Sequence, residues 1–375
     1  MSYRPTPDAP GGVDRIFLWT VLALLLLGTL AVFSSMASLA THRAEGGLGG
    51  LMLRRLTHVG MGIAALLILS RIDYHVVARW SRAVLLFSLG LVGLVWWFAE
   101  GPGASARWLR IAGASFQPSE LARAALTVYL ATLLARKQPC IADMDRALLP
   151  ALCWIGLGVG LIGPSNLSAA VLLLVVSAVL LFLGRIPVRQ LLVVGLVGIA
   201  LSGILIGMAP YRWERLERFA ARIGQGELDP LGDDYQVVQS LIALANGGLF
   251  GVGMGKSVQR DFLPLPYNDF VFAIIVEEYG LVGGAALVGL FVVLLVRGFF
   301  YVARWAPDAL GFLLAGGLTT ALLVQAFVHV LIVVGLGPVT GQTLPFVSYG
   351  GTALLVSCAQ AGIVLNVSRQ ARRRQ

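Results

Sequence analysis

The hydrophobic positions of this chain gather into long runs that short polar segments separate. A helix that crosses a bilayer needs about 20 predominantly apolar residues, because in lipid the backbone polar groups must be satisfied within the structure. The runs therefore predict an all-α, polytopic membrane protein with ten transmembrane helices. Their approximate bounds are 14–36, 56–71, 82–99, 118–135, 147–163, 167–184, 190–209, 270–296, 309–336 and 346–367.

Composition narrows the class of protein further. The chain is 58% hydrophobic and 13% charged, whereas soluble domains average about 45–50% apolar and about 25% charged residues. A water-soluble globule and a disordered chain are thereby excluded. The cysteines, at positions 140, 153 and 358, have no spacing typical of a metal site or a disulfide framework. The chain has a net charge of +9. In a membrane protein such an excess reflects the Lys and Arg residues of cytoplasmic loops, which face anionic lipid headgroups. We therefore expect no nucleic acid partner.

The arginines predict an orientation. Ten spans place both termini on one side, and the segments on that side hold 16 cations against 11 on the other. Cytoplasmic loops carry the excess of Lys and Arg. We therefore expect a cytoplasmic N-terminal tail (1–13), a membrane domain (14–368) and a basic cytoplasmic tail (369–375). The 210–268 segment, between the seventh and eighth runs, is then a large extracytoplasmic loop.

The first part of that loop has helical periodicity. Over 211–223, apolar residues recur at helical spacing beside a parallel stripe of arginines, which are Arg212, Arg215, Arg218 and Arg222. One interpretation is a helix in the membrane interface, with its cations at the depth of lipid phosphates. The other is a solvated helix whose arginines pair with Glu214 and Glu217.

Ionisable residues at membrane depth are candidates for function. Glu120 and Arg123 are three residues apart on one predicted helix, so they are either functional groups or an internal ion pair. Glu277 and Glu278 lie in the eighth run. His329 shares a helix face with Gln325 and has no second His or Cys nearby, which favours a buried, hydrogen-bonded histidine over a metal ligand.

Asp269 follows the loop directly, where the eighth run opens. It is either a helix cap or, if Asn268 caps the helix, a first-turn carboxylate at the boundary between water and lipid. In the second case Asp269 can accept a proton from a hydroxyl, while Lys256 and Arg260 hold an anionic leaving group. The nearby Gly251-Val-Gly-Met-Gly-Lys-Ser sequence lacks the first glycine of a P-loop, since position 250 is Phe250, and no buried strand precedes it.

Several motifs together resemble the SEDS family of FtsW, RodA and SpoVE proteins, in family order, from about residue 14 to 368. They are Arg107-Trp-Leu with Phe116-Gln-Pro-Ser-Glu120; Tyr235-Gln with Gln239-Ser-Leu; Gly247-Gly-Leu-Phe-Gly251; Asp269-Phe with Glu277-Glu-Tyr-Gly280; and Pro338-Val-Thr-Gly341 with Leu344-Pro and Ser348-Tyr-Gly-Gly351. The resemblance implies a peptidoglycan glycosyltransferase of the bacterial cytoplasmic membrane that polymerises lipid II. It also implies a class B penicillin-binding protein as partner, with other divisome or elongasome membrane proteins.

The resemblance also implies roles for particular residues. Asp269 falls on the essential aspartate of the family and is the predicted general base. The predicted ligands of the undecaprenyl diphosphate leaving group are Arg107, Arg212, Arg215, Lys256 and Arg260; a divalent cation, Mg or Mn, could share that task. The other predicted substrate-binding residues are Glu120, Arg123, Gln239, Ser240, Glu277 and Ser348.

The chain departs from the family pattern at some positions. Pro164-Ser-Asn-Leu stands where many members have Pro-Asp-Leu-Gly, so a role for a carboxylate there is in doubt. Arg123 replaces a lysine, and His329 an asparagine. The 262–264, 278–280 and 339–342 segments are more similar to FtsW than to RodA, which favours a role in septal wall synthesis during cell division. The alternatives are a RodA-type elongation polymerase, a lipid II flippase or transporter, and a non-catalytic scaffold for a transpeptidase.

Overall fold

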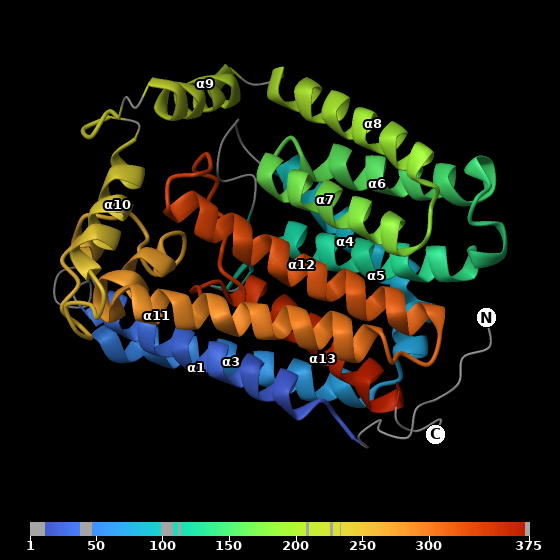
Figure 1. Ribbon diagram of the computed structural model, residues 1–375, viewed down its shortest axis with the longest axis horizontal. Helices are drawn as coiled ribbons and strands as arrows, with labels where there is room; N and C mark the ends of the chain where they lie inside the picture. Colours follow the sequence, from blue (N-terminus) through green and yellow to red (C-terminus); the bar gives the residue numbers. More distant parts are fainter. Residues whose placement is uncertain are drawn as a thin grey trace.

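The computed structural model describes residues 12–37, 47–98, 108–111, 114–207, 210–225, 228–232 and 234–371. Its long helices lie side by side along the longest axis of the molecule (Figure 1). They are α1 (Arg15–Ala37), α3 (Gly47–Arg71), α4 (Tyr74–Phe98), α5 (Pro118–Arg136), α6 (Leu149–Ile162), α7 (Leu167–Leu183), α8 (Val188–Gly207), α11 (Val271–Val296), α12 (Ala309–Val333) and α13 (Gly351–Ala371).

Shorter elements connect these helices. Two helices, α9 (Pro210–Gln225) and α10 (Tyr235–Gly247), lie in the segment between α8 and α11. A small antiparallel hairpin of β1 (Leu109–Ile111) and β2 (Ala114–Phe116) precedes α5. Four short helical turns are η2 (Gln138–Cys140), η3 (Met144–Leu148), η4 (Gln259–Asp261) and η5 (Arg297–Ala303). The hairpin is the one exception, within the described residues, to the all-α prediction.

Each of the ten predicted apolar runs falls on one of the ten long helices. In the described chain, seven segments are long and apolar enough to cross a membrane, and α7 and α8 are shorter apolar helices. The helix α5 also carries Glu120 and Arg123 within its apolar sequence. The all-α, polytopic class is thus confirmed, whereas the number of ten spans stays a prediction.

Some predicted bounds were wrong for a physical reason. The last run was predicted to begin at residue 346, but α13 begins at Gly351. The backbone of Phe346 is in the left-handed region, with φ of 65°, which a regular helix does not accommodate. Likewise α12 ends at Val333, because Gly335 adopts a φ of 79°. Residues 334–350 are therefore an irregular segment, called here the 334–350 segment.

The helix α13 lies within the bundle, since 15 of its 21 residues are buried and the other six are only partly exposed. It packs along α3, and Gly362 permits their close approach. A Cβ atom at residue 362 would lie 2.6 Å from the backbone oxygen of Leu66. Small residues at such crossings let helix backbones come together, which is a common basis of helix association in membranes.

The two ends of the described chain meet at one end of the bundle. The backbone N–H of Asp14 donates to the hydroxyl of Ser368 at 3.0 Å, and the guanidinium of Arg297 donates to the carboxylate of Asp14, with Nε 3.0 Å from Oδ2. At the same end, His75 lies between the carboxylates of Asp73 and Asp308, at 2.8 and 2.9 Å. The position of both chain ends at one end of the bundle agrees with an even number of membrane crossings. The side of the membrane that this end faces stays a prediction.

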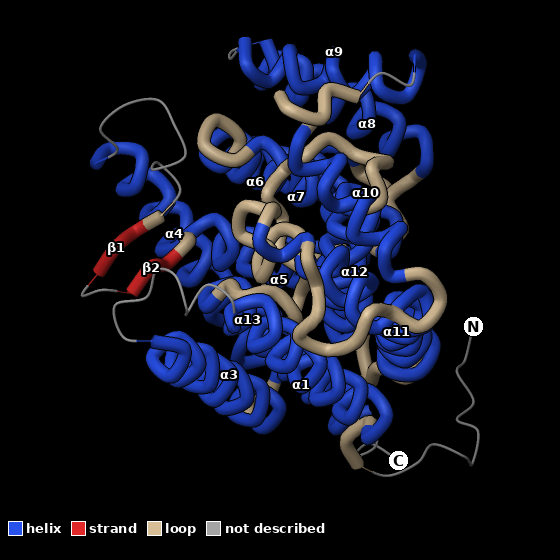
Figure 2. The backbone as a smooth tube through the Cα atoms, turned by 90° about the vertical axis from the view of Figure 1, so that its left-hand side faces the viewer, coloured by secondary structure: helices blue, strands red, loops and turns tan. Residues whose placement is uncertain are grey.

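The opposite end carries α9, α10, the loops before α11 and the hairpin (Figure 2). The predicted helix over 211–223 is observed as α9. Its arginines do not all act alike. Arg218 pairs with Glu214 at 3.4 Å, whereas Arg222 points into the protein and donates to the carbonyl oxygen of Gly337 at 2.9 Å. Trp213, on the apolar side of α9, is 63% exposed, so each interpretation of this helix accounts for part of its surface.

The contact at Gly362 gives a first test. We expect Gly362→Ala to lower the free energy of unfolding by about 1–3 kcal/mol, because the added methyl group overpacks the α3–α13 crossing. The matched control is Gly60→Ala in α3, where a Cβ atom meets nothing within 4 Å and alanine favours the helix. Thermal unfolding midpoints of the two purified variants in one detergent measure the difference. Equal midpoints would contradict the close packing.

Candidate functional site

Asp269 lies in a turn that directly precedes α11. The backbone N–H groups of Asn268 and Asp269 both donate to the carbonyl oxygen of Leu265, at 3.0 and 3.2 Å. Neither alternative for the cap is observed, because neither Asp269 nor Asn268 stands at the cap position. The helix begins at Val271, with Phe270 at the cap position. The Asn268 side chain instead donates from Nδ2 to Oδ1 of Asp269 at 2.8 Å.

The 334–350 segment forms the wall opposite this turn. The hydroxyl of Ser348 donates to the carbonyl oxygen of Asn268 at 2.6 Å and accepts from the backbone N–H of Leu344 at 2.8 Å. The backbone N–H of Tyr349 donates to the carbonyl oxygen of Tyr267 at 2.9 Å. Gly341 lies close to the carboxylate, because a Cβ atom there would be 3.5 Å from Oδ2 of Asp269. The predicted site residues Asp269 and Ser348 are thus brought together.

Arg55 of α3 holds this wall in place, and sequence reasoning missed it. Its side chain is 1% exposed. Nη1 donates to the carbonyl oxygen of Ser348 at 2.8 Å, and Nη2 donates to those of Val347 and Phe346 at 3.0 and 3.3 Å. The sequence signal that could have identified Arg55 was its position at the start of the second apolar run, where a charged side chain can turn back into the bundle.

Two tyrosines flank the carboxylate. The rings of Tyr267 and Tyr349 meet edge to face, with centroids 5.7 Å apart. Burial raises the pKa of Tyr267, and the charges of Tyr349 and Asp269 raise it further. Burial also raises the pKa of Tyr349, against the opposing effect of Arg54 and Arg55. Both phenols therefore stay protonated near neutral pH and are available as hydrogen-bond donors.

Glu277 and Glu278 anchor the loop that carries the predicted cations. Glu277 accepts hydrogen bonds from the hydroxyl of Ser257 and from the backbone N–H of Val258, at 3.2 Å from the latter. Glu278 accepts from the hydroxyl of Ser34 and from the backbone N–H of Gly255, at 3.1 Å from the latter. Both carboxylates are 1% exposed. The structure thus uses Glu277 for anchoring, and substrate binding by Glu277 stays a prediction.

Glycines let the same loop approach the kinked helix α11. Gly280, with a φ of 72°, interrupts the helical geometry of α11. A Cβ atom at Gly280 would lie 2.2 Å from the carbonyl oxygen of Leu249, and one at Gly251 would lie 2.2 Å from that of Glu278. These motif glycines therefore permit a backbone crossing that no other residue type could make.

The loop cations are separated from Asp269 along α11. Lys256 is exposed, and Arg260 donates from Nη1 to the carbonyl oxygen of Ser34 at 3.1 Å. Glu277, which anchors their loop, lies about 9 Å farther along the helix than its first residue, at a rise of about 1.5 Å per residue. The loop that carries the cations is thus anchored at the same end of the bundle as Asp269.

A buried polar network supports the 334–350 segment from its other side. Arg123 donates from Nη2 to Glu120 at 2.5 Å and to Oε1 of Gln325 at 3.1 Å. Gln325 in turn donates to the carbonyl oxygen of Thr343 at 3.0 Å. The internal ion pair that the spacing suggested is confirmed. Nδ1 of His329 lies 2.7 Å from the carbonyl oxygen of Gln342, which confirms a buried, hydrogen-bonded histidine.

The remaining predicted residues lie farther from Asp269 or are not described. Ser240 is fully buried and donates to the carbonyl oxygen of Val333 at 2.9 Å, which ties α10 to the end of α12. Gln239 is half-buried on α10, and Arg215 is exposed on α9. Arg107 lies outside the described residues, as does the side chain of Arg212, whose backbone is part of α9. Among the described residues, no group of three or more His, Cys, Asp or Glu side chains converges as a metal site.

Fold and site together define a polytopic helical membrane protein that holds a half-buried carboxylate, two phenols and several cations at one end of its bundle. The chain belongs to the FtsW/RodA/SpoVE family, whose model, described as a cell cycle protein, matches residues 15–373. This membership confirms the resemblance of the motifs.

Individual relatives cover nearly the whole chain. It is 34% identical to the stage V sporulation protein E of Bacillus subtilis (strain 168), over 96% of this chain and 98% of that one. It is also 34% identical to a protein of Geobacter sp. (strain M18) named probable peptidoglycan glycosyltransferase FtsW, again over 96% and 98%.

Solved structures agree in fold. One chain belongs to a peptidoglycan synthase complex that coordinates polymerization and crosslinking; its TM-score is 0.76 at 30% identity, over 96% of this chain and 98% of that one. The rod shape determining protein RodA of Thermus thermophilus matches with a TM-score of 0.69 at 27% identity, over 96% and 97%.

The Ser348 contact gives a second test. Ser348→Ala leaves the carbonyl oxygen of Asn268 and the N–H of Leu344 without this partner, which costs about 1–3 kcal/mol of unfolding free energy. We expect faster hydrogen–deuterium exchange of the amides in 265–270 and 344–350. The matched control is Ser357→Ala, because the buried hydroxyl of Ser357 donates only within its own helix, to the carbonyl oxygen of Ala353. The same exchange in both variants would disprove the coupling.

Proposed function

We propose that this protein is a peptidoglycan glycosyltransferase that polymerises lipid II, with Asp269 as the general base. The observation that carries the proposal is the position of the Asp269 carboxylate. It is half-buried at one end of the bundle, held by Asn268 and faced by the 334–350 segment. Family membership and relatives named probable peptidoglycan glycosyltransferases support the reaction class.

The proposed chemistry uses one carboxylate. Asp269 takes the proton of the 4-hydroxyl group of the acceptor N-acetylglucosamine as that oxygen attacks C1 of the donor muramoyl sugar. The new C–O bond forms with inversion, the bond from C1 to the diphosphate breaks, and undecaprenyl diphosphate leaves with the electron pair. Inversion in a single displacement needs a base and a stabilised leaving group, whereas retention would need a second carboxylate as nucleophile.

Cations stabilise the leaving diphosphate in this proposal. The candidates are Arg107, Arg212, Arg215, Lys256 and Arg260. Guanidinium and ammonium groups form charge-assisted hydrogen bonds with phosphate oxygens. In this proposal Tyr267 and Tyr349 donate hydrogen bonds to sugar oxygens, since both phenols remain protonated. A divalent cation, if bound with the substrate, would neutralise part of the diphosphate charge; the steps above use protein side chains alone.

The biological setting is also proposed. We infer that the end with Asp269 is extracytoplasmic and both termini are cytoplasmic, on the basis of the arginine distribution. The relative solved within a peptidoglycan synthase complex supports a transpeptidase partner, a class B penicillin-binding protein. The greater similarity of the 262–264, 278–280 and 339–342 segments to FtsW favours septal synthesis within the divisome, and the structural match to RodA keeps elongation as the alternative.

Asp269→Asn tests the general base. Loss of a general base slows a reaction by about 10²–10⁴-fold. We therefore expect purified Asp269→Asn, with its transpeptidase partner and labelled lipid II in detergent, to form glycan strands at that reduced rate and to bind lipid II as the wild type does. The matched control is Glu217→Gln, an isosteric change of an exposed carboxylate on α9, which should leave the rate unchanged.

The same assay separates the other functions. Polymerisation at the wild-type rate in Asp269→Asn would eliminate this residue as the base. Transfer of lipid II across sealed vesicles without polymer formation would favour a flippase. A folded Asp269→Asn variant that still supports division in cells would favour a non-catalytic scaffold.

A further inference from the structure

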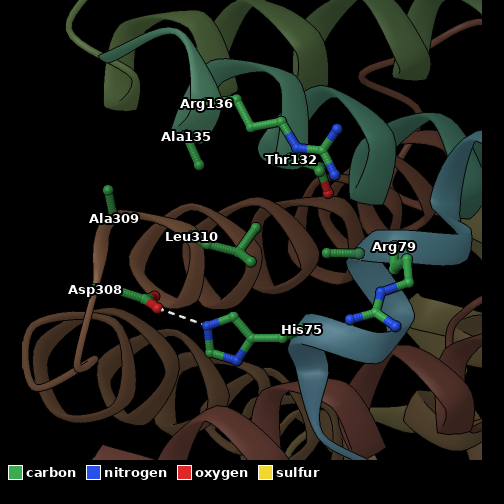
Figure 3. Close-up of a pocket in the computed structure, with 9 residues that line it drawn as sticks. His75, Arg79, Thr132, Ala135, Arg136, Asp308, Ala309 and Leu310 are labelled. Atoms are coloured by element: carbon green, nitrogen blue, oxygen red, sulfur yellow. Dashed lines mark hydrogen bonds and ion pairs between the residues drawn. The ribbon is translucent and has the colours of Figure 1, made fainter. Parts of the chain in front are cut away.

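A cavity lined by both charged and apolar side chains lies at the opposite end of the bundle from Asp269. It has a volume of about 450 Å³ and is lined by the first turns of α4, the last turns of α5 and the start of α12 (Figure 3). This size is within the range of about 300–1,000 Å³ that is typical of small-molecule sites. The proposed catalytic chemistry does not use any residue of its lining.

Two arginines give the cavity an excess of positive charge. Arg79 of α4 and Arg136 of α5 both line it and both are exposed. Across the described ranges, neither guanidinium forms an ion pair with a carboxylate. Arg123 and Arg297, in contrast, are paired with carboxylates of the bundle. The two lining arginines therefore retain all of their donors for an external anion.

The one carboxylate of the lining is already engaged. Oδ2 of Asp308 lies 2.9 Å from Nε2 of His75, and Oδ1 accepts the backbone N–H of Gly311 at 2.7 Å, where it caps α12. The other ring nitrogen of His75 lies 2.8 Å from Asp73. Figure 3 shows the contact of His75 with Asp308 on one side of the cavity, with Arg79 and Arg136 away from it. The arginines are consequently not neutralised by this group.

The surroundings of the cavity indicate a lipid. On the same helix as Arg79, the apolar side chains of Val76, Trp80, Val84 and Phe87 are 43%, 61%, 41% and 63% exposed. In a membrane protein such a surface contacts acyl chains. The cavity thus combines two unpaired guanidinium groups with an adjoining lipid-facing helix. Basic pockets between helices near the membrane surface are known to take anionic lipid headgroups.

We propose that this cavity binds the phosphate of an anionic phospholipid, through Arg79 and Arg136, with the acyl chains along the exposed face of α4. The headgroup bridges α4 and α5 at a point where no side-chain pair in the described structure does so. A bound lipid would therefore couple the composition of the surrounding leaflet to the packing of α4 against α5 and α12.

The test measures lipid binding by the full chain. Native mass spectrometry gives the dissociation constants of phosphatidylglycerol and of phosphatidylcholine with the same acyl chains, for the wild type and for Arg79→Gln, Arg136→Gln and the double variant. Each arginine near a membrane surface contributes about fivefold to binding of an anionic lipid. We expect each single variant to bind phosphatidylglycerol about fivefold more weakly, and the double variant about 25-fold more weakly.

Two controls separate specific binding from general effects. Arg189→Gln removes an exposed arginine in the first turn of α8, outside the cavity lining, and should leave the affinity unchanged. Arg79→Lys keeps the charge and should retain most of the binding. The thermal unfolding midpoint without added lipid verifies that each variant is folded.

Several results would overturn the proposal. They are equal affinities for phosphatidylglycerol and phosphatidylcholine, an equal loss in Arg189→Gln, or displacement of the lipid by millimolar inorganic phosphate, which would identify a free-anion site. Preferential binding of an acidic peptide in competition with phosphatidylglycerol would likewise replace the lipid by a protein partner.

Discussion

The end of the bundle that carries Asp269 depends on the hydrogen bonds of one buried side chain, the guanidinium group of Arg55. Removal of a charged group from water costs several kcal/mol unless its hydrogen bonds are replaced. Three consecutive carbonyl oxygens, of residues 346, 347 and 348, replace those of its two Nη atoms. The same hydrogen bonds satisfy carbonyl groups of the 334–350 segment, which forms no helix. The guanidinium group on α3 and the carbonyl groups of this segment therefore each lower the free-energy cost of burying the other. Ser348 then extends this support to the turn that carries Asp269.

A general constraint explains why so many charged side chains near the site are structural. Backbone that is not helical is tolerated within a membrane domain only when other groups satisfy its N–H and C=O groups. Glu277 and Glu278 do this for the loop of residues 252–259, and Arg222 does it for the carbonyl oxygen of Gly337. Charged side chains are suited to this work, because hydrogen bonds with an ionised partner are about twice as strong as neutral ones.

The sequence could predict those features of the fold and site whose signal lies within a short stretch of the chain. The ten apolar runs all coincide with helices, because hydrophobicity over about 20 residues is a local property. The pairing of Glu120 with Arg123 and the helix α9 were accessible for the same reason, since their spacing lies within one element. The role of Arg55 was not accessible, because its acceptors lie more than 290 positions away. The cap of α11 was assigned wrongly, although its start was predicted to within one residue, because Asn268, an excellent cap in isolation, donates to Asp269 in the folded turn.

Four arginines already donate hydrogen bonds to groups of the protein, which limits the side chains that are available to bind a diphosphate. Arg55, Arg123 and Arg222 donate to groups of the protein, and Arg260 uses one of its nitrogens for Ser34. Of the predicted diphosphate ligands with described side chains, Lys256 and Arg215 are the exposed ones. They project from two different elements, a loop anchored on α11 and the helix α9. A diphosphate held by both would have to lie between these elements, with its sugar directed toward Asp269 and its polyprenyl chain toward the lipid.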